Sequence, residues 1–450
     1  MNIVPIIDAG LGNSSYVVDL GDGSALVVDP EREPTPYLKT ASDLGLRLRF
    51  TVETHLHADF VSGSRELVAE GATLVAPAGS NLSFEHRRLG DGDEIDLGGL
   101  TMRAIATPGH TPEHLSYLLI DGADPVALFS GGTLMAGGVA RTDLLTPELS
   151  EPLARAAYRS IRDRLLVLPD DLVVYPTHGA GSFCSAGPTD DRTTTIGRER
   201  RTNPLLAVAT EDEFVETLFA GLGSYPTYFG RMRHLNQAGP TVHGGALPQL
   251  AGLTPADVVE LQDSGGLVVD VRPIDRFAAG HVPNSLSIEM RDQFGTWLGW
   301  IADPDHPIAL VVDEGQDVSA LVWQMLNVGF EIPVGRLAGG VSAWRAAGHA
   351  VATTALVGPG GFDPAATILD VRQLSEWADG HLAQATHLEL GDIPAQADRF
   401  ERNVQVHCGH GQRAMTAASL LERAGVEEIT VSTGGPDEIA TALVEAARSR

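Results

Sequence analysis

Three histidine-bearing segments contain the residues whose types and spacing best fit metal chemistry. The first is Thr54-His55-Leu56-His57-Ala58-Asp59, in which an aspartate follows two histidines that are one residue apart. His110, in TPGHTPEH, and His178, in YPTHGAGSFC, follow at long range. Two imidazoles at the end of a strand can bind one metal ion, and a nearby carboxylate can bind the same ion or orient one of the histidines. The pattern therefore predicts a metal site, intact or decayed, built from these loops.

A second candidate site is centred on Cys408. The apolar stretch VQVH ends at this cysteine, and Gly409-His410-Gly411-Gln412-Arg413 leads into the helical pattern MTAASLLERAG. A cysteine on such a strand-to-helix turn lies near free backbone N–H groups and the positive end of a helix dipole, which favour the thiolate. The two glycines let the backbone curl around the sulfur, and Arg413 can reinforce an anion pocket. The alternative is a buried, inert cysteine.

The apolar pattern indicates the elements that must position the histidines. SYVVDL, GDGS and ALVVDP together predict a hairpin, and RLRFTVET predicts a strand that ends at His55. VSGSRELVAE has helical character, so the first two histidines fall on a strand-to-helix loop. Strands predicted at TMRAIATP, LSYLLID and VALFSGG, and a helix near residues 148–166, continue a mixed α/β pattern to residue 235.

An internal repeat occupies the C-terminal half of the chain. Residues 267–288 match residues 368–390, and in each copy an apolar strand ends in Asp-Val-Arg, which predicts two parallel α/β units. Asp313 stands where the second copy has Cys408, and Val318 where it has Arg413, so we expect the first copy to be a scaffold or an interface. The recurring residues are Asp270, Arg272, Gly280 and His281, which return as Asp370, Arg372, Gly380 and His381, and Gly339-Gly340, which returns as Gly434-Gly435. We expect Asp270 and His281 to be structural.

The composition bounds the classes of partner. A chain of 450 residues suggests about three domains. Its 31 basic and 59 acidic residues give a net charge of −28, which would repel nucleic acid and anionic membranes. The sequence has no apolar run of about 18 residues, and its start, MNIVPIIDAG, lacks the features of a signal peptide. Two cysteines are too few for a disulfide framework. We therefore expect a cytoplasmic protein with neither nucleic acid nor membrane as partner.

The order HxHxD, GHT and TH resembles the metallo-β-lactamase superfamily over about residues 1–235. Within it, THLHADF, ARTDL at 140–144 and HGAGSFC are most similar to persulfide dioxygenases of the ETHE-like kind. This resemblance implies an αββα sandwich that holds one Fe(II) and oxidises a glutathione-type persulfide to sulfite with O2. It implies that Asp59 and His178 are pocket groups and that Arg141 contacts an acidic thiol cofactor, although a surface salt bridge is an equal alternative for Arg141. Cys184 is either a sulfur relay or a packed thiol.

The sequence departs from the superfamily pattern at two positions. Phe60 stands where a fourth histidine is usual, and Gly132, in Ser130-Gly131-Gly132, stands where a metal-bridging aspartate is usual. Both departures argue against a dinuclear zinc site of the glyoxalase-II type. We therefore expect a mononuclear three-histidine site with His55, His57 and His110 as metal ligands, which leaves positions for water, persulfide and O2.

The Cys408 loop has the form C-x-x-G-x-R and, with the repeat, resembles the rhodanese family over about residues 254–448. This resemblance implies that Cys408 carries sulfane sulfur as a persulfide. A cysteine phosphatase would have five residues between cysteine and arginine, whereas four stand here. The expected organisation is a metallo-β-lactamase-like domain at 1–235, a linker at 236–253, a rhodanese-like domain without the cysteine at 254–352, a linker at 353–362 and an active rhodanese-like domain at 363–448.

The sequence leaves three functions open. The first is an iron-dependent persulfide dioxygenase that uses glutathione as co-substrate and is fused to a thiosulfate, persulfide or thiol sulfurtransferase. The second is a mononuclear zinc thioesterase fused to the same sulfurtransferase. The third is a metal-free scaffold carrying an active rhodanese. Metal content separates the third from the others, and O2 dependence separates the first from the second. A homodimer is a further expectation.

Overall fold

The computed structural model describes residues 1–186, 191–363 and 366–448. The chain forms two compact units, Met1–Leu247 with Leu326–Gly329, and Pro248–Met325 with Phe330–Arg450. In the described part of the chain, none of the helices has both the length and the apolar character needed to cross a bilayer.

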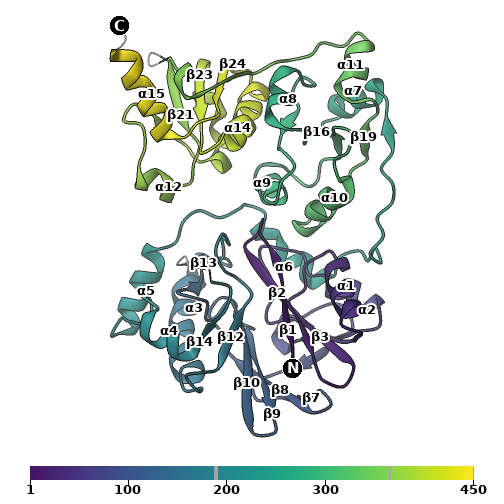
Figure 1. Ribbon diagram of the computed structural model, residues 1–450, viewed down its shortest axis with the longest axis vertical. Coiled ribbons are helices and arrows are strands. Elements are labelled where there is room, and N and C mark those ends of the chain that lie inside the picture. Colours follow the sequence, from purple (N-terminus) through teal and green to yellow (C-terminus); the bar gives the residue numbers. More distant parts are fainter. Residues whose placement is uncertain (187–190, 364–365, 449–450) are drawn as a thin grey trace. The chain divides into compact units, whose positions relative to one another are not determined.

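The first unit contains two six-stranded sheets (Figure 1). The predicted hairpin is formed by β2 and β3, with Tyr16 opposite Val28, and β3 to β6 continue in parallel. The first sheet has the order β1 (Ile3–Asp8), β2 (Asn13–Asp19), β3 (Ser24–Val28), β4 (Arg47–Val52), β5 (Thr73–Pro77) and β6 (Arg87–Leu89). The second has the order β14 (Thr194–Thr195), β12 (Val173–Pro176), β10 (Asp124–Gly131), β9 (Leu115–Asp121), β8 (Leu100–Ala106) and β7 (Glu94–Asp96), and β11 (Val139–Ala140) pairs with β13 (Ser185–Ala186).

Alternation along the strands creates three apolar layers between four layers of structure. Tyr16 and Val18 point between the two sheets toward Tyr117 and Phe129, while Val17, between them, packs with the helices on the other face. The helices of this unit are α1 (Thr35–Asp43), α2 (Ser64–Ala69), α3 (Pro147–Arg159), the π-helix η2 (Ser160–Leu165), α4 (Ile196–Thr202), α5 (Glu211–Ala220) and α6 (Phe229–Ala238), with the 3-10 turn η1 (Ala78–Ser80). Residues of α1 and α2 cover the first sheet, and residues of α3 and α5 cover the second. The expected αββα sandwich is confirmed.

The second unit contains two five-stranded sheets whose paired neighbours are all parallel. Both sheets have the same strand order, which confirms the two predicted parallel α/β units. The first sheet is β15 (Gly252–Leu253), β19 (Gly335–Leu337), β18 (Ile308–Val311), β16 (Leu267–Asp270) and β17 (Leu286–Ser287). The second is β20 (Ala355–Val357), β24 (Glu427–Ser432), β23 (Arg402–His407), β21 (Thr367–Asp370) and β22 (Thr386–His387).

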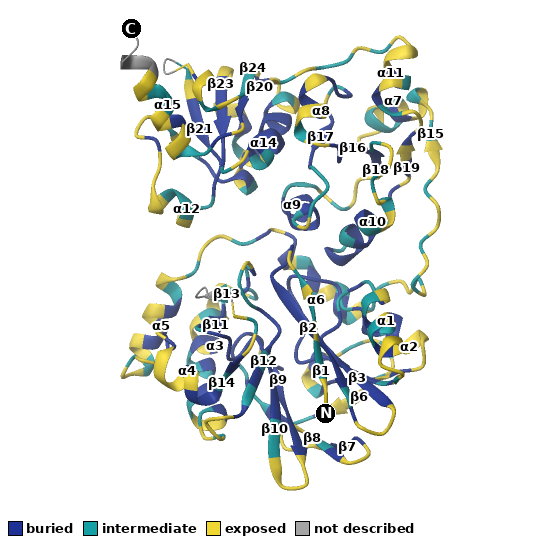
Figure 2. Ribbon diagram, viewed as in Figure 1, coloured by how far each residue is buried: buried dark blue, intermediate teal, exposed yellow. Residues whose placement is uncertain are grey.

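Helices accompany each parallel sheet, and the central strands are buried while the outer helix faces are exposed (Figure 2). The first copy has α7 (Pro255–Asp263), α8 (Ile274–Ala279), α9 (Phe294–Ile301), α10 (Val318–Asn327) and α11 (Gly340–Ala346). The second has α12 (Leu374–Asp379), α13 (Ile393–Gln396), α14 (Gln412–Arg423) and α15 (Pro436–Arg448), with the 3-10 turns η3 (Pro359–Gly361), η4 (Leu390–Asp392) and η5 (Ala397–Arg399).

The residues that recur in sequence build the same buried motif in both copies. Arg272 forms a two-pronged ion pair with Asp270, and its Nη2 donates to the carbonyl of Gly280 at 2.9 Å. Arg372 does the same with Asp370 and with the carbonyl of Gly380, at 2.7 Å. The histidine that follows stacks on an aromatic ring at 3.7 Å in each copy, His281 on Phe277 and His381 on Trp377. These contacts support a structural role for the recurring residues.

Candidate functional site

The three histidine segments meet inside the first unit because each follows the end of a strand. Residues 53–63 connect β4 to α2, residues 107–114 connect β8 to β9, and residues 177–184 follow β12. His55, His110 and His178 are each at most 2 % exposed, and so is His57. Burial lowers the pKa of His110 to about 3 and the pKa of His55 well below its ordinary value, with neighbouring imidazoles adding to both effects. His55 and His110 are therefore neutral at pH 7, as metal ligation requires.

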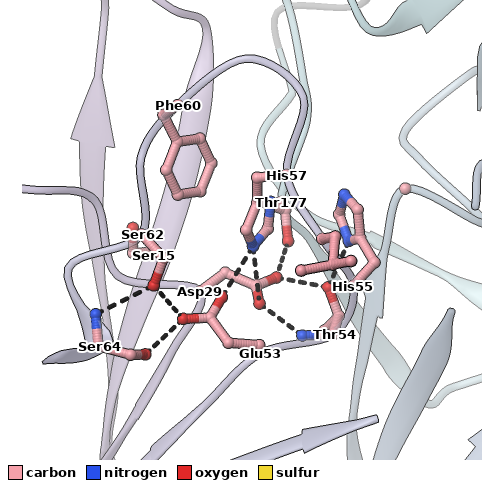
Figure 3. A network of polar contacts seen from close by, with 12 residues as sticks. Ser15, Asp29, Glu53, Thr54, His55, His57, Phe60, Ser62, Ser64 and Thr177 are labelled. Atoms are coloured by element: carbon pink, nitrogen blue, oxygen red, sulfur yellow. Dashed lines mark hydrogen bonds and ion pairs between the residues drawn. The ribbon is translucent and has the colours of Figure 1, made fainter. Parts of the chain in front are cut away.

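Asp29, which follows β3, organises the site by binding two loops (Figure 3). Its Oδ1 accepts from the backbone N–H of Thr54 at 2.7 Å, and its Oδ2 accepts from the Thr54 hydroxyl at 2.7 Å. The Thr177 hydroxyl, next to His178, also donates to Oδ2. Burial raises the pKa of this carboxyl, but His57 and the hydroxyl donors outweigh that effect and hold it below its ordinary value. One fully buried carboxylate thus holds the His55 loop and the His178 loop in register.

The hydrogen bonds fix which nitrogen of each imidazole faces the centre. The Thr54 hydroxyl donates to Asp29, so it accepts from Nδ1 of His55 at 2.8 Å. Nδ1 of His110 faces the backbone carbonyl of Arg141 at 2.7 Å, to which it can only donate. In both rings Nδ1 therefore carries the hydrogen, and Nε2 presents a lone pair.

Asn13 fixes the third imidazole in the same way. Its amide nitrogen donates to the Asp59 carboxylate at 2.8 Å, so its amide oxygen accepts from Nδ1 of His178 at 2.9 Å. Burial raises the pKa of Asp59, but the His178 ring and the Asn13 hydrogen bond outweigh that effect and keep the carboxyl ionised. Nε2 of His178 lies 3.4 Å from Nε2 of His55, and a neutral His178 ring with its hydrogen on Nδ1 presents a lone pair there.

A cation between these rings would remove the repulsion between two facing lone pairs. The ligand atoms of His55, His110 and His178 all lie within 4.8 Å of one another, and Nε2 of His110 has no hydrogen-bond partner among the described residues. Three converging Nε2 lone pairs, each oriented through its Nδ1 hydrogen bond, are the donor set that divalent transition metals prefer. Two further groups also fit within 4.8 Å in the described chain, Asp29 with His55 and His57, and His57 with Asp59 and His178. The site therefore fits a metal ion.

His57 is held differently from His55, by two carboxylates and an aromatic ring (Figure 3). Its Nε2 lies 3.0 Å from Glu53 and 3.4 Å from Asp29, and its ring stacks on Phe60 with centroids 4.1 Å apart. Burial opposes a charge here, but Asp29 and Glu53 raise the pKa of His57 to about 10. The combination expected from the sequence, His55 with His57 and His110, is not among the groups that converge within 4.8 Å in the described chain, whereas the combination with His178 is.

Gly132 and His114 together fill the place where the superfamily pattern has aspartate. The backbone N–H of Gly132 donates to Nε2 of His114 at 3.0 Å, and Nδ1 of His114 lies 2.9 Å from the Thr107 hydroxyl. A Cβ atom on Gly132 would lie 2.7 Å from Cδ2 of His110. His114 is therefore a structural residue, and the space beside His110 admits no side chain at position 132.

Arg141 and Cys184 are both engaged inside the protein. The Arg141 guanidinium pairs with both oxygens of Asp143, at 2.8 and 2.9 Å, and lies 4.2 Å from the ring centroid of Tyr225. The sequence left open a surface salt bridge for Arg141, but this ion pair is buried, since Arg141 is 3 % exposed. The Arg141 carbonyl orients His110. Cys184 is fully buried, and burial and Asp59 raise the pKa of its thiol well above the ordinary value.

The cysteine loop of the second copy has the predicted strand-to-helix geometry. Cys408 follows β23, and α14 begins four residues later at Gln412. The N–H of Gly411, which has a φ of 93° that favours glycine, donates to Cys408 Sγ at 3.2 Å. Gly409 is half-buried and His410 is exposed, whereas Cys408 itself is only 2 % exposed.

Arg413 lies beside this loop but is already paired. Its two terminal nitrogens donate to the two carboxylate oxygens of Glu376, at 2.5 and 2.8 Å. In the first copy the equivalent loop contains no thiol, and the Gln316 side chain bridges it by accepting from the N–H of Asp313 at 2.7 Å and donating to the Val271 carbonyl at 2.8 Å. The cysteine chemistry is thus confined to one copy.

Comparison with known proteins agrees with this architecture. Residues 8–178 match the metallo-beta-lactamase superfamily, and residues 254–347 and 360–442 match the rhodanese-like domain family. Human persulfide dioxygenase ETHE1, mitochondrial, is 31% identical over 198 residues, which cover 43% of this chain and 70% of the human protein. A hydroxyacylglutathione hydrolase from Xylella fastidiosa is 30% identical over 243 residues, which cover 53% of this chain and 86% of that protein.

A solved structure resembles a larger part of the chain. The crystal structure of a metallo-beta-lactamase from Staphylococcus aureus subsp. aureus COL superposes with a TM-score of 0.66 and 28% sequence identity. The superposition covers 75% of this chain and 98% of that chain.

Proposed function

Because the chain belongs to the metallo-β-lactamase superfamily and continues into two rhodanese-like domains, we propose that it is a persulfide dioxygenase fused to a sulfurtransferase. The observation that carries the proposal is the convergence of the ligand atoms of His55, His110 and His178 within 4.8 Å, in a chain that also provides a loop-held cysteine. The homology to persulfide dioxygenase covers the part of the chain that contains the imidazoles.

At the histidine site, we assign His55, His110 and His178 as the ligands of one Fe(II). The iron would supply the redox chemistry that joins the persulfide to O2, while the four electrons that reduce O2 come from the sulfane sulfur. The overall reaction takes one persulfide, one O2 and one water and releases one thiol, one sulfite and two protons. The chain contributes the orientation of each ligand, through Thr54, the Arg141 carbonyl and Asn13. Such outer hydrogen bonds are worth about 10- to 100-fold in metal affinity.

The neutral charge of the donor set supports a thiolate-type substrate. Three uncharged imidazoles leave the full charge of the divalent ion to attract an anionic persulfide, whereas an aspartate at position 132 would offset part of it. All three ligand side chains are buried, which lowers the local dielectric and strengthens this attraction. His57 is paired with Glu53 and Asp29, so its charge is balanced by these carboxylates rather than directed at the site.

At the cysteine site, we assign Cys408 as the sulfur carrier. The persulfide formed on its Sγ would accept hydrogen bonds from the loop N–H groups, of which that of Gly411 already points at the sulfur. Thiosulfate, persulfides and thiols are the proposed donors and acceptors, and glutathione is the proposed carrier thiol. The fusion would then link a domain that makes or consumes persulfide to a domain that oxidises it.

The alternative of a metal-dependent thioesterase is favoured by one observation. His57, Asp59 and His178 form a second group within 4.8 Å in the described chain, as a two-metal hydrolase would need, and a hydroxyacylglutathione hydrolase is 30% identical. The charge on His57 and the absence of a bridging aspartate weigh against a metal ion there.

The test is oxygen uptake by anaerobically iron-loaded protein on addition of glutathione persulfide. We expect stoichiometric uptake with sulfite as product, and loss of both in His55→Ala. A protein that hydrolyses S-acylglutathione under strictly anaerobic conditions, with no oxygen uptake from persulfide, would instead favour the thioesterase.

A further inference from the structure

The first rhodanese-like domain has no cysteine, yet one of its segments, residues 281–292, packs against the helix that follows Cys408. This segment runs along α14, the helix that begins at the cysteine loop. Near the C-terminal end of α14, Nε2 of His281 lies 2.9 Å from the Glu422 carboxylate. One turn earlier in the helix, the Ser419 hydroxyl accepts from the N–H of Ser287 at 3.0 Å. As the segment proceeds, it therefore approaches the N-terminal end of α14, and Arg291 comes next.

The first domain also contacts the cysteine loop itself. A Cβ atom on Gly411, the residue whose N–H donates to Cys408, would lie 3.0 Å from Cδ1 of Ile274. Ile274 is the first residue of α8, in the first domain. The cysteine loop is therefore bounded on one side by the domain that lacks a cysteine.

Arg291 brings a positive charge to this boundary. Burial lowers the pKa of its guanidinium, the charge of Arg413 adds to this, and the charges of Cys408, Glu289 and Asp292 oppose it. The residue is half-buried. Glu289 and Asp292 belong to the same segment, but neither forms an ion pair with Arg291 among the described residues. Arg413, in contrast, has both terminal nitrogens on Glu376.

The internal repeat shows that this arginine is specific to the copy next to the cysteine. Residues Ile288 to Asp292, IEMRD, match Leu388 to Asp392, LELGD, and make the same backbone bonds. The N–H of Met290 donates to the Val271 carbonyl at 2.9 Å, and that of Leu390 donates to the Val371 carbonyl at 3.2 Å. The equivalent of Arg291 is Gly391.

Gly391 cannot carry a side chain in this fold. A Cβ atom there would lie 2.1 Å from Nε1 of Trp300. The second domain thus presents Gly391 to the first domain, which has no cysteine loop. The first domain, in return, presents Arg291 to the second domain, which has the loop, and Arg291 has no ion-pair partner among the described residues.

We propose that Arg291 is the anion-recognition residue of the Cys408 site and binds the sulfonate end of a thiosulfonate-type donor such as thiosulfate. The planar guanidinium can donate to two sulfonate oxygens, which orients the sulfane sulfur toward Cys408. The Cys408 thiolate attacks that sulfur, the new bond joins Sγ to it, and the sulfur–sulfur bond of the donor breaks. The electron pair of that bond leaves with sulfite. The proposal rests on the sulfur transfer proposed above.

The test compares an anionic with a neutral sulfur donor. Thiosulfate and a neutral dialkyl trisulfide are each assayed with cyanide as acceptor, for the full-length protein, Arg291→Gln, Arg291→Lys and the control Arg336→Gln. Arg336 is an exposed residue on β19 of the same domain. Loss of a charge-assisted, two-pronged contact should raise KM for thiosulfate about 10- to 100-fold in Arg291→Gln. The trisulfide reaction should change by less than about threefold, and Arg291→Lys should lie between.

Alkylation of Cys408 provides a readout that needs no sulfur transfer. The ratio of the rate with anionic iodoacetate to that with neutral iodoacetamide should fall in Arg291→Gln and stay unchanged in Arg336→Gln. An equal loss with both sulfur donors, or an unchanged alkylation ratio, would overturn the role of Arg291. If the unaltered protein transferred sulfur from neither donor, the proposed sulfurtransferase function would fail, and the alkylation ratio would still decide whether Arg291 recognises anions.

Discussion

Replacing Gly132 by aspartate would restore the residue type that the superfamily pattern leads one to expect, yet we predict that it weakens metal binding. The Cβ atom alone would lie 2.7 Å from Cδ2 of His110 and 3.0 Å from Cβ of Ala140. Overpacking of this kind costs about 1–3 kcal/mol. If His110 rotates away, it also loses its hydrogen bond to the Arg141 carbonyl, worth about 0.5–1.5 kcal/mol.

The expected effect of Gly132→Asp is a loss of about 2–4 kcal/mol in the unfolding free energy of the metal-free protein. Displacing one imidazole ligand should also lower Fe(II) affinity by at least about tenfold, since 1.4 kcal/mol corresponds to a factor of ten. Urea unfolding measures the first quantity, and anaerobic Fe(II) titration against a competing chelator measures the second.

Gly132→Ala is the matched control, because it adds the same Cβ without a carboxylate. We expect it to be destabilised and to bind Fe(II) more weakly, like the aspartate variant. An aspartate variant that bound Fe(II) more tightly than the unaltered protein would refute the reasoning, since His110 would then not be fixed where the structure has it.

Three further predictions concern the remaining buried groups. The unfolding free energy of the metal-free protein should fall below about pH 6.5, because His110, whose pKa burial lowers to about 3, takes up a proton on unfolding. It should also fall as the pH rises from about 6.5 toward 10, because His57, whose pKa Asp29 and Glu53 raise to about 10 despite burial, loses its charge sooner in the unfolded chain. In urea titrations, His57→Gln should remove the decline between about pH 6.5 and 8, below the range in which the buried Cys184 thiol adds its own decline. Cys408→Ser should abolish sulfur transfer from thiosulfate to cyanide or a thiol and leave iron content unchanged, while residual transfer would point to Cys184. Arg372→Ala should cost about 3–5 kcal/mol of unfolding free energy by leaving the buried Asp370 unpaired, against less than about 0.5 kcal/mol for the exposed Arg276→Ala; equal losses would contradict a structural ion pair.

Much of the fold could be predicted from the sequence because its signals are local or repeated. The alternation in SYVVDL and ALVVDP predicted the β2–β3 hairpin. The repeat predicted two parallel sheets, which share one strand order. The turn around Cys408 was predictable because a strand, two glycines and a helical pattern follow one another within a short stretch.

The residues that orient the histidines could not be found from the sequence. Asp29 is 148 positions from Thr177, and Asn13 is 165 positions from His178. Neither residue lies in a histidine motif, and only the folded chain brings them to the imidazoles. The single local signal was the position of Asp29 directly after the apolar strand, before the proline that ends ALVVDP.

From the sequence we predicted His57 as the third ligand and His178 as a pocket group, whereas the group that converges with His55 and His110 contains His178. Two histidines one residue apart suggest that both bind one metal ion. Nε2 of His57, however, is paired with the carboxylate of Glu53, four residues earlier. Nothing in the spacing of His178 indicates that its Nε2 lies 3.4 Å from that of His55. In the same way, Arg291 stands in no motif, and the contacts of its segment with α14 follow from packing between the two copies of the repeat.

The most direct test of the central claim is the Fe(II) content of anaerobically loaded His178→Ala and His57→Gln, measured by elemental analysis beside the unaltered protein. We predict one iron per chain in the unaltered protein, retention of that iron in His57→Gln and its loss in His178→Ala. Loss of iron in His57→Gln with retention in His178→Ala would contradict the account and assign the metal to His55, His57 and His110.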